Sequence, residues 1–224
     1  MRLCFSIVLL SLISLGSPPL AADPVACTDI AVTVDAPDPA LGSRICQVAK
    51  RGLSEMAACG VLVPFPVTIN VVDTLPDGCI GLYHCDEQLL EVLSPKNMSL
   101  KRVSKSAFAD VPDAPFFDSV VIHELAHAAF DAVPCPFGSC PATAEYVAYA
   151  MQIMSLPSGE LAKFEASFEF EKRVSYDEIN AIILFMAPEK FVRKTWGHLS
   201  QRGDQCAYIR QIMNGNILFD TEHL

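Results

Sequence analysis

Two histidines and a glutamate lie inside an apolar stretch of the chain, and this combination restricts the fold more than any other feature. Residues 120–131 read VVIHELAHAAFD, in which His123, Glu124, His127 and the final Asp131 are polar. Residues four apart project from the same face of a helix, so the two imidazoles would lie together. Burying these groups without a partner would be costly. The stretch therefore predicts a core helix whose polar side chains share a partner.

A metal ion is the partner that this spacing indicates. His123 and His127 can bind one Zn²⁺ through ring nitrogens, and Glu124 would then lie beside the open coordination position. Zinc lowers the pKa of a bound water molecule to about 7, and Glu124 could take its proton as a general base. A core helix with two hydrogen-bonded histidines is the alternative. The motif predicts a zinc-dependent hydrolase.

A third protein ligand is expected, because catalytic zinc usually has three protein ligands and a water molecule. Glu145, in the stretch ATAEYVAYAMQ of the next predicted helix, is the first candidate. Its alternative role is that of an acidic residue stabilised by the helix dipole. Asp131 and His198 are rivals, although Asp131 is better placed to orient an imidazole than to bind the metal.

The segment between the two helices contains Pro134, Pro136, Gly138 and Pro141, which break a helix and allow the chain to reverse. A disulfide between Cys135 and Cys140 could hold this turn closed. We expect such a clamp to set the position of Glu145.

The motif His123-Glu124-Leu125-Ala126-His127 followed by Glu145 resembles the gluzincin branch of the zincin metallopeptidases. The resemblance implies hydrolysis of peptide bonds. It also implies that the strand at residues 88–93 is the antiparallel edge of a cleft, along which a peptide substrate adds as a further strand. The chain as a whole resembles an uncharacterised bacterial group of exported proteins. It departs from thermolysin-like enzymes at Tyr149, where they carry an acidic residue, and it lacks the third histidine of metzincins.

Such a peptidase also needs a hydrogen-bond donor for the developing oxyanion. Tyr146, Tyr149 and His198 are the candidates. His198 resembles the downstream histidine of thermolysin-like enzymes only in chain order, and its alternative is a surface histidine beside Trp196.

Strands are expected at residues 29–35, 67–73, 80–84 and 88–93, and a helix at 39–58 that stops before Gly60. After Pro95 the apolar spacing is helical, over residues 116–131, 142–156, 159–173, 177–186, 189–201 and 204–213. This order predicts an α+β fold. We expect one zincin-like domain at residues 23–224, with a small mixed or antiparallel sheet, a backing helix, an active-site helix and a mostly helical C-terminal half.

Residues 1–22 are typical of a secretory signal peptide, because Arg2 precedes an apolar run at 3–15 and small residues end at Ala22. We expect cleavage after Ala22 and a secreted or periplasmic protein without a stable membrane anchor. An uncleaved N-terminal anchor is the alternative, but the apolar run is short for a membrane span.

Removal of residues 1–22 takes away Cys4 and leaves eight cysteines, an even number that predicts up to four disulfides in an exported chain. They are Cys27, Cys46, Cys59, Cys79, Cys85, Cys135, Cys140 and Cys206. Cys135–Cys140 and Cys79–Cys85 are plausible local pairs. The formal net charge of −10 argues against nucleic acid as a partner.

The expected function is hydrolysis of a peptide or protein substrate by zinc-bound water. The first alternative is an exported metal- or protein-binding module that keeps the scaffold without turnover. A zinc amidase acting on cell-wall peptides is a weaker alternative. The intact Glu124 favours turnover, because binding alone does not require that residue.

Overall fold

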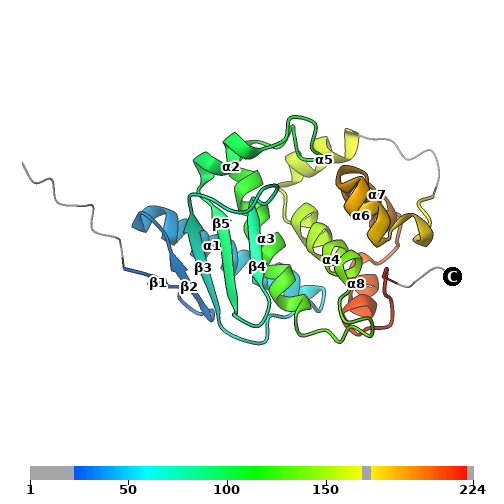
Figure 1. The fold of residues 1–224 in the computed structure, drawn as a ribbon, viewed down its shortest axis with the longest axis horizontal. Helices are drawn as coiled ribbons and strands as arrows, with labels where there is room; N and C mark the ends of the chain where they lie inside the picture. The colour runs from blue at the N-terminus through cyan, green and yellow to red at the C-terminus, as the bar shows by residue number, and fades with distance from the viewer. Residues whose placement is uncertain (1–22, 168–172, 221–224) are drawn as a thin grey trace, which may run out of the picture.

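The computed structural model describes residues 23–167 and 173–220, so the predicted signal peptide lies outside the described residues. Within these ranges a five-stranded sheet has the order β1 (Val25–Ala26), β2 (Val32–Asp35), β3 (Val67–Val72), β5 (Leu89–Leu93) and β4 (Gly81–His84). The central strands β2, β3 and β5 run parallel, whereas β1 and β4 pair antiparallel at the two edges (Figure 1). The sheet is therefore mixed.

The expectation that residues 88–93 form the edge of the sheet is wrong, because β5 lies between β3 and β4. The sequence of β5 explains its interior position. Leu90, Val92 and Leu93 are fully buried, whereas β4 contains one buried residue, Tyr83. The more apolar strand of the hairpin occupies the interior, and β4 becomes the edge strand.

Helices α1 (Pro39–Ala58) and α3 (Asp113–Phe130) pack against each other, and both contact the sheet. Helix α1 has the predicted bounds. The side chain of Asp38 caps its N-terminus by accepting a hydrogen bond from the Leu41 N–H, and Gly60 follows its end with a φ of 77°. Helix α3 contacts β4, the edge strand. The edge of the sheet therefore borders the helix that carries the two histidines.

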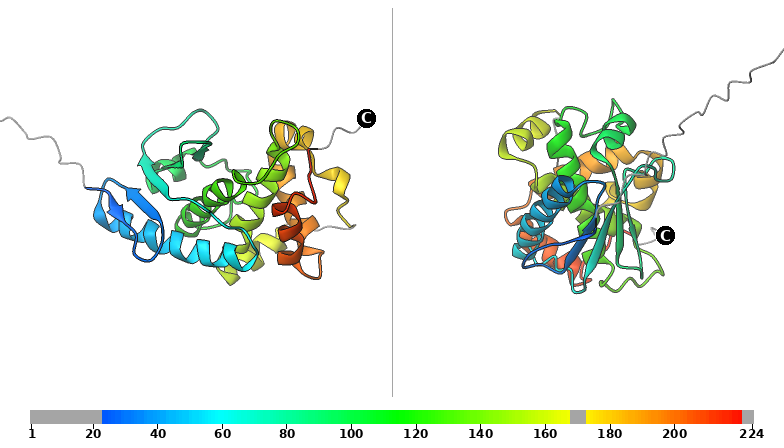
Figure 2. Two further views of the ribbon diagram at one scale, coloured as in Figure 1. Left: turned by 90° about the horizontal axis from the view of Figure 1, so that it is seen from below. Right: turned by 90° about the vertical axis from the view of Figure 1, so that its left-hand side faces the viewer.

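The second half of the described chain is helical, as expected, and its later helices lie at the end of the molecule opposite β1, whereas its first long helix packs beside the sheet (Figure 2). Helix α4 contacts α3 on one side and α7 on another. The helices after β5 are α2 (Pro95–Lys101), α3, α4 (Pro141–Met154), α5 (Ser158–Ala166), α6 (Ala181–Met186), α7 (Pro188–Ser200) and α8 (Gln205–Met213). No helix in the described part of the chain is long and apolar enough to cross a membrane.

Two predicted helices are shorter in the structure. Helix α5 ends at Ala166, and residues 168–172, which belonged to the same prediction, lie outside the described residues. The helix expected at 177–186 is divided into a 3₁₀ turn, Tyr176–Glu178, and α6. The division has a local cause, because the Asn180 side chain accepts a hydrogen bond from the Ile183 N–H and starts a new helix.

Three disulfides are formed among the described residues: Cys27–Cys46, Cys59–Cys206 and Cys135–Cys140. The predicted Cys135–Cys140 pair is confirmed. The predicted Cys79–Cys85 pair is wrong, because both thiols are free. These cysteines flank β4, and its four extended residues alone span about 13 Å, well beyond the Cα separation of a disulfide.

Candidate metal centre

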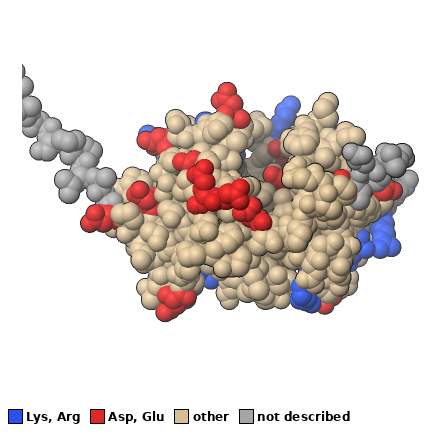
Figure 3. All heavy atoms as spheres, turned by 60° about the horizontal axis from the view of Figure 1, so that its bottom comes forward, with Lys and Arg blue, Asp and Glu red and all other residues tan. Residues whose placement is uncertain are grey.

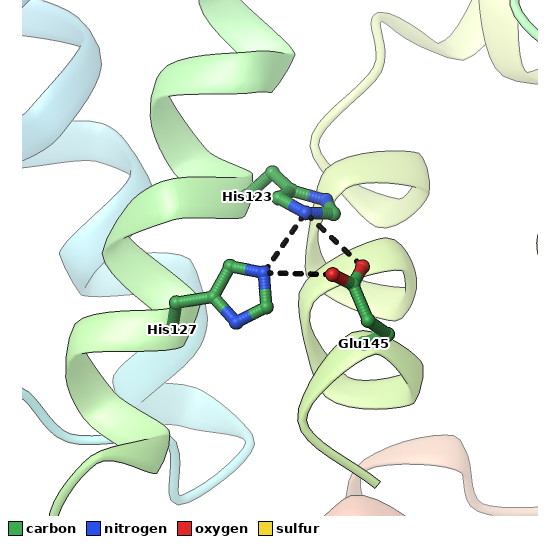
Figure 4. A group of neighbouring side chains, drawn as sticks. All are labelled: His123, His127 and Glu145. Carbon is green, nitrogen blue, oxygen red and sulfur yellow. Dashed lines mark hydrogen bonds and ion pairs between the residues drawn. The ribbon is translucent and has the colours of Figure 1, made fainter. Parts of the chain in front are cut away.

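Helix α3 is buried along almost its whole length and presents both histidines to α4. His123 is 8 % exposed, and its Nε2 atom lies 3.1 Å from Nε2 of His127, one turn later (Figure 4). Burial lowers the pKa of His127 to about 4, with Glu145 opposing the shift and His123 adding to it. A neutral imidazole keeps a lone pair, so His127 is ready to bind a metal at neutral pH.

Glu145 reaches the same point from α4. Its Oε2 atom lies 3.5 Å from Nε2 of His123, and its Oε1 atom lies 3.5 Å from Nε2 of His127 (Figure 4). Burial would raise the pKa of Glu145, but its close contact with His123 and its electrostatic attraction to His127 and His123 hold that pKa below its usual value. The carboxyl group is therefore ionised at neutral pH.

These three side chains form a group that could hold a metal ion, since their ligand atoms lie within 4.8 Å of one another. Oε2 of Glu145 is buried and has no hydrogen-bond partner among the described residues. A buried carboxylate oxygen without a partner is costly. Two imidazole nitrogens and one carboxylate oxygen are also a common donor set for a catalytic metal. The residues present therefore fit a metal ion.

Gln152 orients His123, a role that was not expected from the sequence. Nδ1 of His123 lies 3.0 Å from Oε1 of Gln152, whose Nε2 atom donates to the Ser119 hydroxyl group at 3.2 Å. Because the amide oxygen only accepts, His123 donates from Nδ1, and its Nε2 lone pair faces the centre. The spacing could have indicated this role. Gln152 follows Glu145 by seven residues, so it lies two turns along the same face of α4, the face that meets the histidines.

Asp131 was expected to orient an imidazole, but the structure gives it another partner. The hydroxyl group of Tyr83 donates a hydrogen bond to Oδ2 of Asp131 at 3.0 Å. Asp131 therefore ties the edge strand β4 to the end of α3.

Glu124 lies between α3 and β4 and is 6 % exposed. Burial raises the pKa of its carboxyl group to about 7; the charge of His123 opposes the rise, Glu145 adds to it, and a backbone hydrogen bond from Tyr83 opposes it. Gly81 faces Glu124 so closely that a Cβ atom would lie 2.4 Å from Oε1. The absence of a side chain at Gly81 therefore makes room for this carboxyl group.

Tyr149 lies beside the three candidate metal ligands, whereas Tyr146 and His198, the other two candidates for the oxyanion donor, do not. The ring of Tyr149 meets that of His123 edge-on at 4.6 Å. Burial and the charges of Glu145, Glu189 and Glu124 raise the pKa of Tyr149 well above its usual value, so its hydroxyl group stays protonated.

The structure places His198 and Tyr146 in a separate aromatic cluster with Tyr208 and Phe219. Nδ1 of His198 lies 2.8 Å from the Tyr146 hydroxyl group, and Arg202 contacts the other ring nitrogen. Since Arg202 can only donate, His198 must accept at Nε2 and carry its proton on Nδ1. Both ring nitrogens of His198 are therefore occupied away from the metal ligands.

A cleft extends to both sides of the centre. Two cavities, of about 730 and 600 Å³, share His123, Glu124 and Tyr149 as lining residues, together with 78–80. Asp86 and Asp131 line the larger cavity, and no Lys or Arg of the described chain does so. The smaller cavity is lined by apolar side chains, among them Phe108 and Phe116, and also by charged ones, among them Lys101 and Arg102. The face of the molecule drawn in Figure 3 has a hollow with acidic side chains beside it.

One family profile, described as a family of unknown function (DUF6639), matches residues 32–222. The matched range contains every residue of the centre described above. No curated protein and no solved structure matches the chain.

Proposed function

The chain belongs to the DUF6639 family, whose function is unknown, and we propose from its site that it is an exported zinc-dependent hydrolase that cleaves peptide bonds. One observation carries the proposal above all. His123, His127 and Glu145 converge with a buried Glu145 oxygen that lacks a hydrogen-bond partner among the described residues, and Glu124 follows the first histidine. Structural metal sites need no such carboxyl group beside the ligands.

His123, His127 and Glu145 would hold the zinc ion. When bound there, zinc supplies a Lewis acid that polarises the substrate carbonyl group and makes water acidic enough to lose a proton at neutral pH.

Glu124 is proposed as the general base. A pKa near 7 suits this role, because the carboxylate can accept a proton from the attacking water molecule and the acid can then return it to the leaving amine. The N–H of Tyr83 and the lack of a side chain at Gly81 fix the position of this carboxyl group.

Tyr149 is proposed as the donor to the developing oxyanion. Its hydroxyl group is protonated at neutral pH and lies on the helix that carries Glu145, one turn after that ligand. A donor aimed at the reacting carbonyl oxygen stabilises the transition state more than the ground state.

The edge strand β4 is proposed to bind the substrate backbone. Among the described strands β4 pairs only with β5, and Gly81, Leu82 and Tyr83 line the larger cavity. An extended peptide could add to the free edge through main-chain hydrogen bonds and lie across the centre. Since the cleft continues on both sides of the ligands, the preferred substrate would extend in both directions from the cleaved bond.

The three disulfides indicate an oxidising compartment. We propose that the chain reaches it through the signal peptide at residues 1–22 and is secreted or periplasmic.

Metal content of the oxidised protein tests the proposal. One zinc ion per chain is expected in the wild type, no zinc in His123→Ala and much less in Glu145→Ala. Glu55→Ala, which removes a carboxyl group from α1 away from the cleft, is the control and should keep its zinc. A folded wild type that cannot be loaded with zinc would remove the metal assignment.

Turnover separates the hydrolase from a binding module. Glu124→Gln should keep zinc and lose cleavage of a mixed peptide library, because the amide cannot accept the proton. A wild type that binds zinc fully but cleaves no peptide in the library would support the non-catalytic alternative.

A further inference from the structure

We propose that the C-terminal segment 217–220 positions the metal ligand Glu145, by supplying the N-terminal cap of α4 through the carboxylate of Asp220. This inference rests on the zinc centre proposed above, since it concerns how one of its ligands is held.

The first turn of α4 does not cap itself. Cys140 occupies the N-cap position and makes no side-chain cap hydrogen bond, because its sulfur atom is bonded to Cys135. Pro141 follows without an N–H group, and the Ala144 N–H bonds to the Cys140 carbonyl group. The N–H groups of Ala142 and Thr143 therefore have no acceptor within the helix and need one from elsewhere in the chain.

Asp220 provides both acceptors from 77 and 78 residues away. Its Oδ1 atom accepts from the Ala142 N–H at 2.8 Å, and its Oδ2 atom accepts from the Thr143 N–H at 2.9 Å. The hydroxyl group of Thr143 also donates to Oδ2, at 2.6 Å. A carboxylate at this end of a helix is stabilised by the helix dipole as well as by these hydrogen bonds.

Thr143 and Phe219 anchor the segment a second time. The Phe219 N–H donates to the Thr143 hydroxyl group at 2.7 Å, and Thr143 is fully buried. The Phe219 ring stacks on Tyr146 at 4.4 Å between ring centres and on Tyr176 at 5.0 Å. The segment therefore contacts α4 at Thr143 and Tyr146, on both sides of Glu145 in the sequence.

Glu145 depends on this first turn for its position. It lies two residues after Thr143, and its two carboxylate oxygens must each reach a different imidazole on α3. The Cys135–Cys140 disulfide restrains the loop before α4 but provides no acceptor for the N–H groups of Ala142 and Thr143. Without Asp220 the first turn would fray, and Glu145 would lose the fixed geometry that a metal ligand needs.

Zinc affinity of the full-length protein, measured by competition with a chromophoric chelator, tests this role. Asp220→Ala should weaken zinc binding about 10- to 100-fold, as loss of a group that orients a ligand does. Asp220→Asn, which keeps one acceptor oxygen, should weaken it less. The matched control is Asp204→Ala, which removes the carboxylate that caps α8 and accepts from the Ala207 N–H at 2.8 Å. It should keep the wild-type affinity.

A second pair of variants keeps the test decisive if Asp220→Ala does not fold. Thr143→Val removes the hydroxyl group that bridges Asp220 and Phe219, and Thr143→Ser retains it. Zinc binding should weaken in the first and be preserved in the second. Equal zinc affinity of Asp220→Ala and Asp204→Ala, at similar melting temperatures, would overturn the positioning role. A wild type that binds no zinc would instead overturn the metal centre itself.

Discussion

Gly81 on the edge strand and Glu124 on the central helix are in such close contact that a Cβ atom on the glycine would lie 2.4 Å from Oε1 of the glutamate. Two residues later in the same strand, Tyr83 donates its backbone N–H to Glu124 and its hydroxyl group to Asp131. One short strand thus fixes the proposed base, and its free edge borders the cleft. The position of β4 and the position of Glu124 cannot change independently.

Gly81→Ala should therefore impair catalysis without removing the metal. The added methyl group would displace Glu124, and a shift of about 1 Å in a catalytic group can lower kcat about 100-fold. Zinc content should stay at one ion per chain, as measured by atomic absorption. Gly159→Ala is the control, because no atom lies within 4 Å of a Cβ built there. Normal kcat in Gly81→Ala would contradict the assigned role of Glu124.

Gln152→Leu should weaken zinc binding about 10-fold, because His123 would lose the acceptor that keeps its proton on Nδ1. Gln152→Glu retains an acceptor at the same distance and should bind zinc as tightly as the wild type. Competition with a chelator at pH 7 measures both. If the leucine and glutamate variants bound zinc equally well, Gln152 would have no part in orienting the ligand.

Tyr149→Phe should lower kcat by about 10- to 100-fold with little change in KM or zinc content, because a donor to the transition state would be lost. Tyr208→Phe makes the same chemical change in the aromatic cluster around His198 and serves as the control. Steady-state kinetics on a cleaved peptide separates the two parameters. A matching loss of kcat in both variants would point to a general effect on packing instead.

Substrate charge should matter on the side of the cleft lined by Asp86 and Asp131. Peptides with lysine at the positions that occupy this side should have a higher kcat/KM than the same peptides with glutamate. Asp86→Asn should reduce the preference about two- to five-fold, the range expected for one exposed charge pair. Asp23→Asn removes an equal charge beside β1, at the far edge of the sheet, and should leave it unchanged.

The metal-free protein should lose stability in mild acid, and His198 should account for part of the loss. Burial, with the charges of Arg202 and Arg173, lowers the pKa of His198 to about 4 in the folded state, against about 6.5 when unfolded. The unfolded chain thus binds more protons between these values, so the free energy of unfolding falls as the pH drops from about 6.5 to 4.

Denaturant unfolding at pH 7 and pH 5 measures this effect. The wild type should lose more stability over the interval than His198→Gln, which cannot titrate there. His127 contributes equally in both proteins and cancels in the comparison. Parallel losses in the two proteins would show that His198 titrates normally in the folded state.

Local features of the chain could be predicted from sequence because their causes are local. Asp38 caps the start of α1 and Gly60 follows its end. The apolar residues around His123 and His127 make α3 a helix of the core. The convergence of Glu145 with both histidines was expected from the helix-breaking residues between the helices and from a disulfide between cysteines five positions apart. The structure brings these three residues together.

Other features depend on contacts between distant parts of the chain, which residue patterns do not encode. Strand β4 has an ordinary strand sequence, and only its pairing places it outside β5. Cys59 joins Cys206 across 147 residues, and Cys79 and Cys85, which look like a local pair in the sequence, are free because β4 separates them. The local sequence around Asp220 did not indicate that this residue caps α4, because a single acidic residue outside a helix is usually exposed to solvent.

The distance along the chain between α4 and its cap has a consequence for biosynthesis. Helix α4 receives acceptors for two of its N–H groups from Asp220, and the Cys59–Cys206 bond needs a residue almost as late. These two N–H groups gain their acceptors only after the chain has been synthesised through residue 220. A zinc centre that requires Asp220 would therefore mature only after that point, and His123, His127 and Glu145 would bind zinc weakly until then.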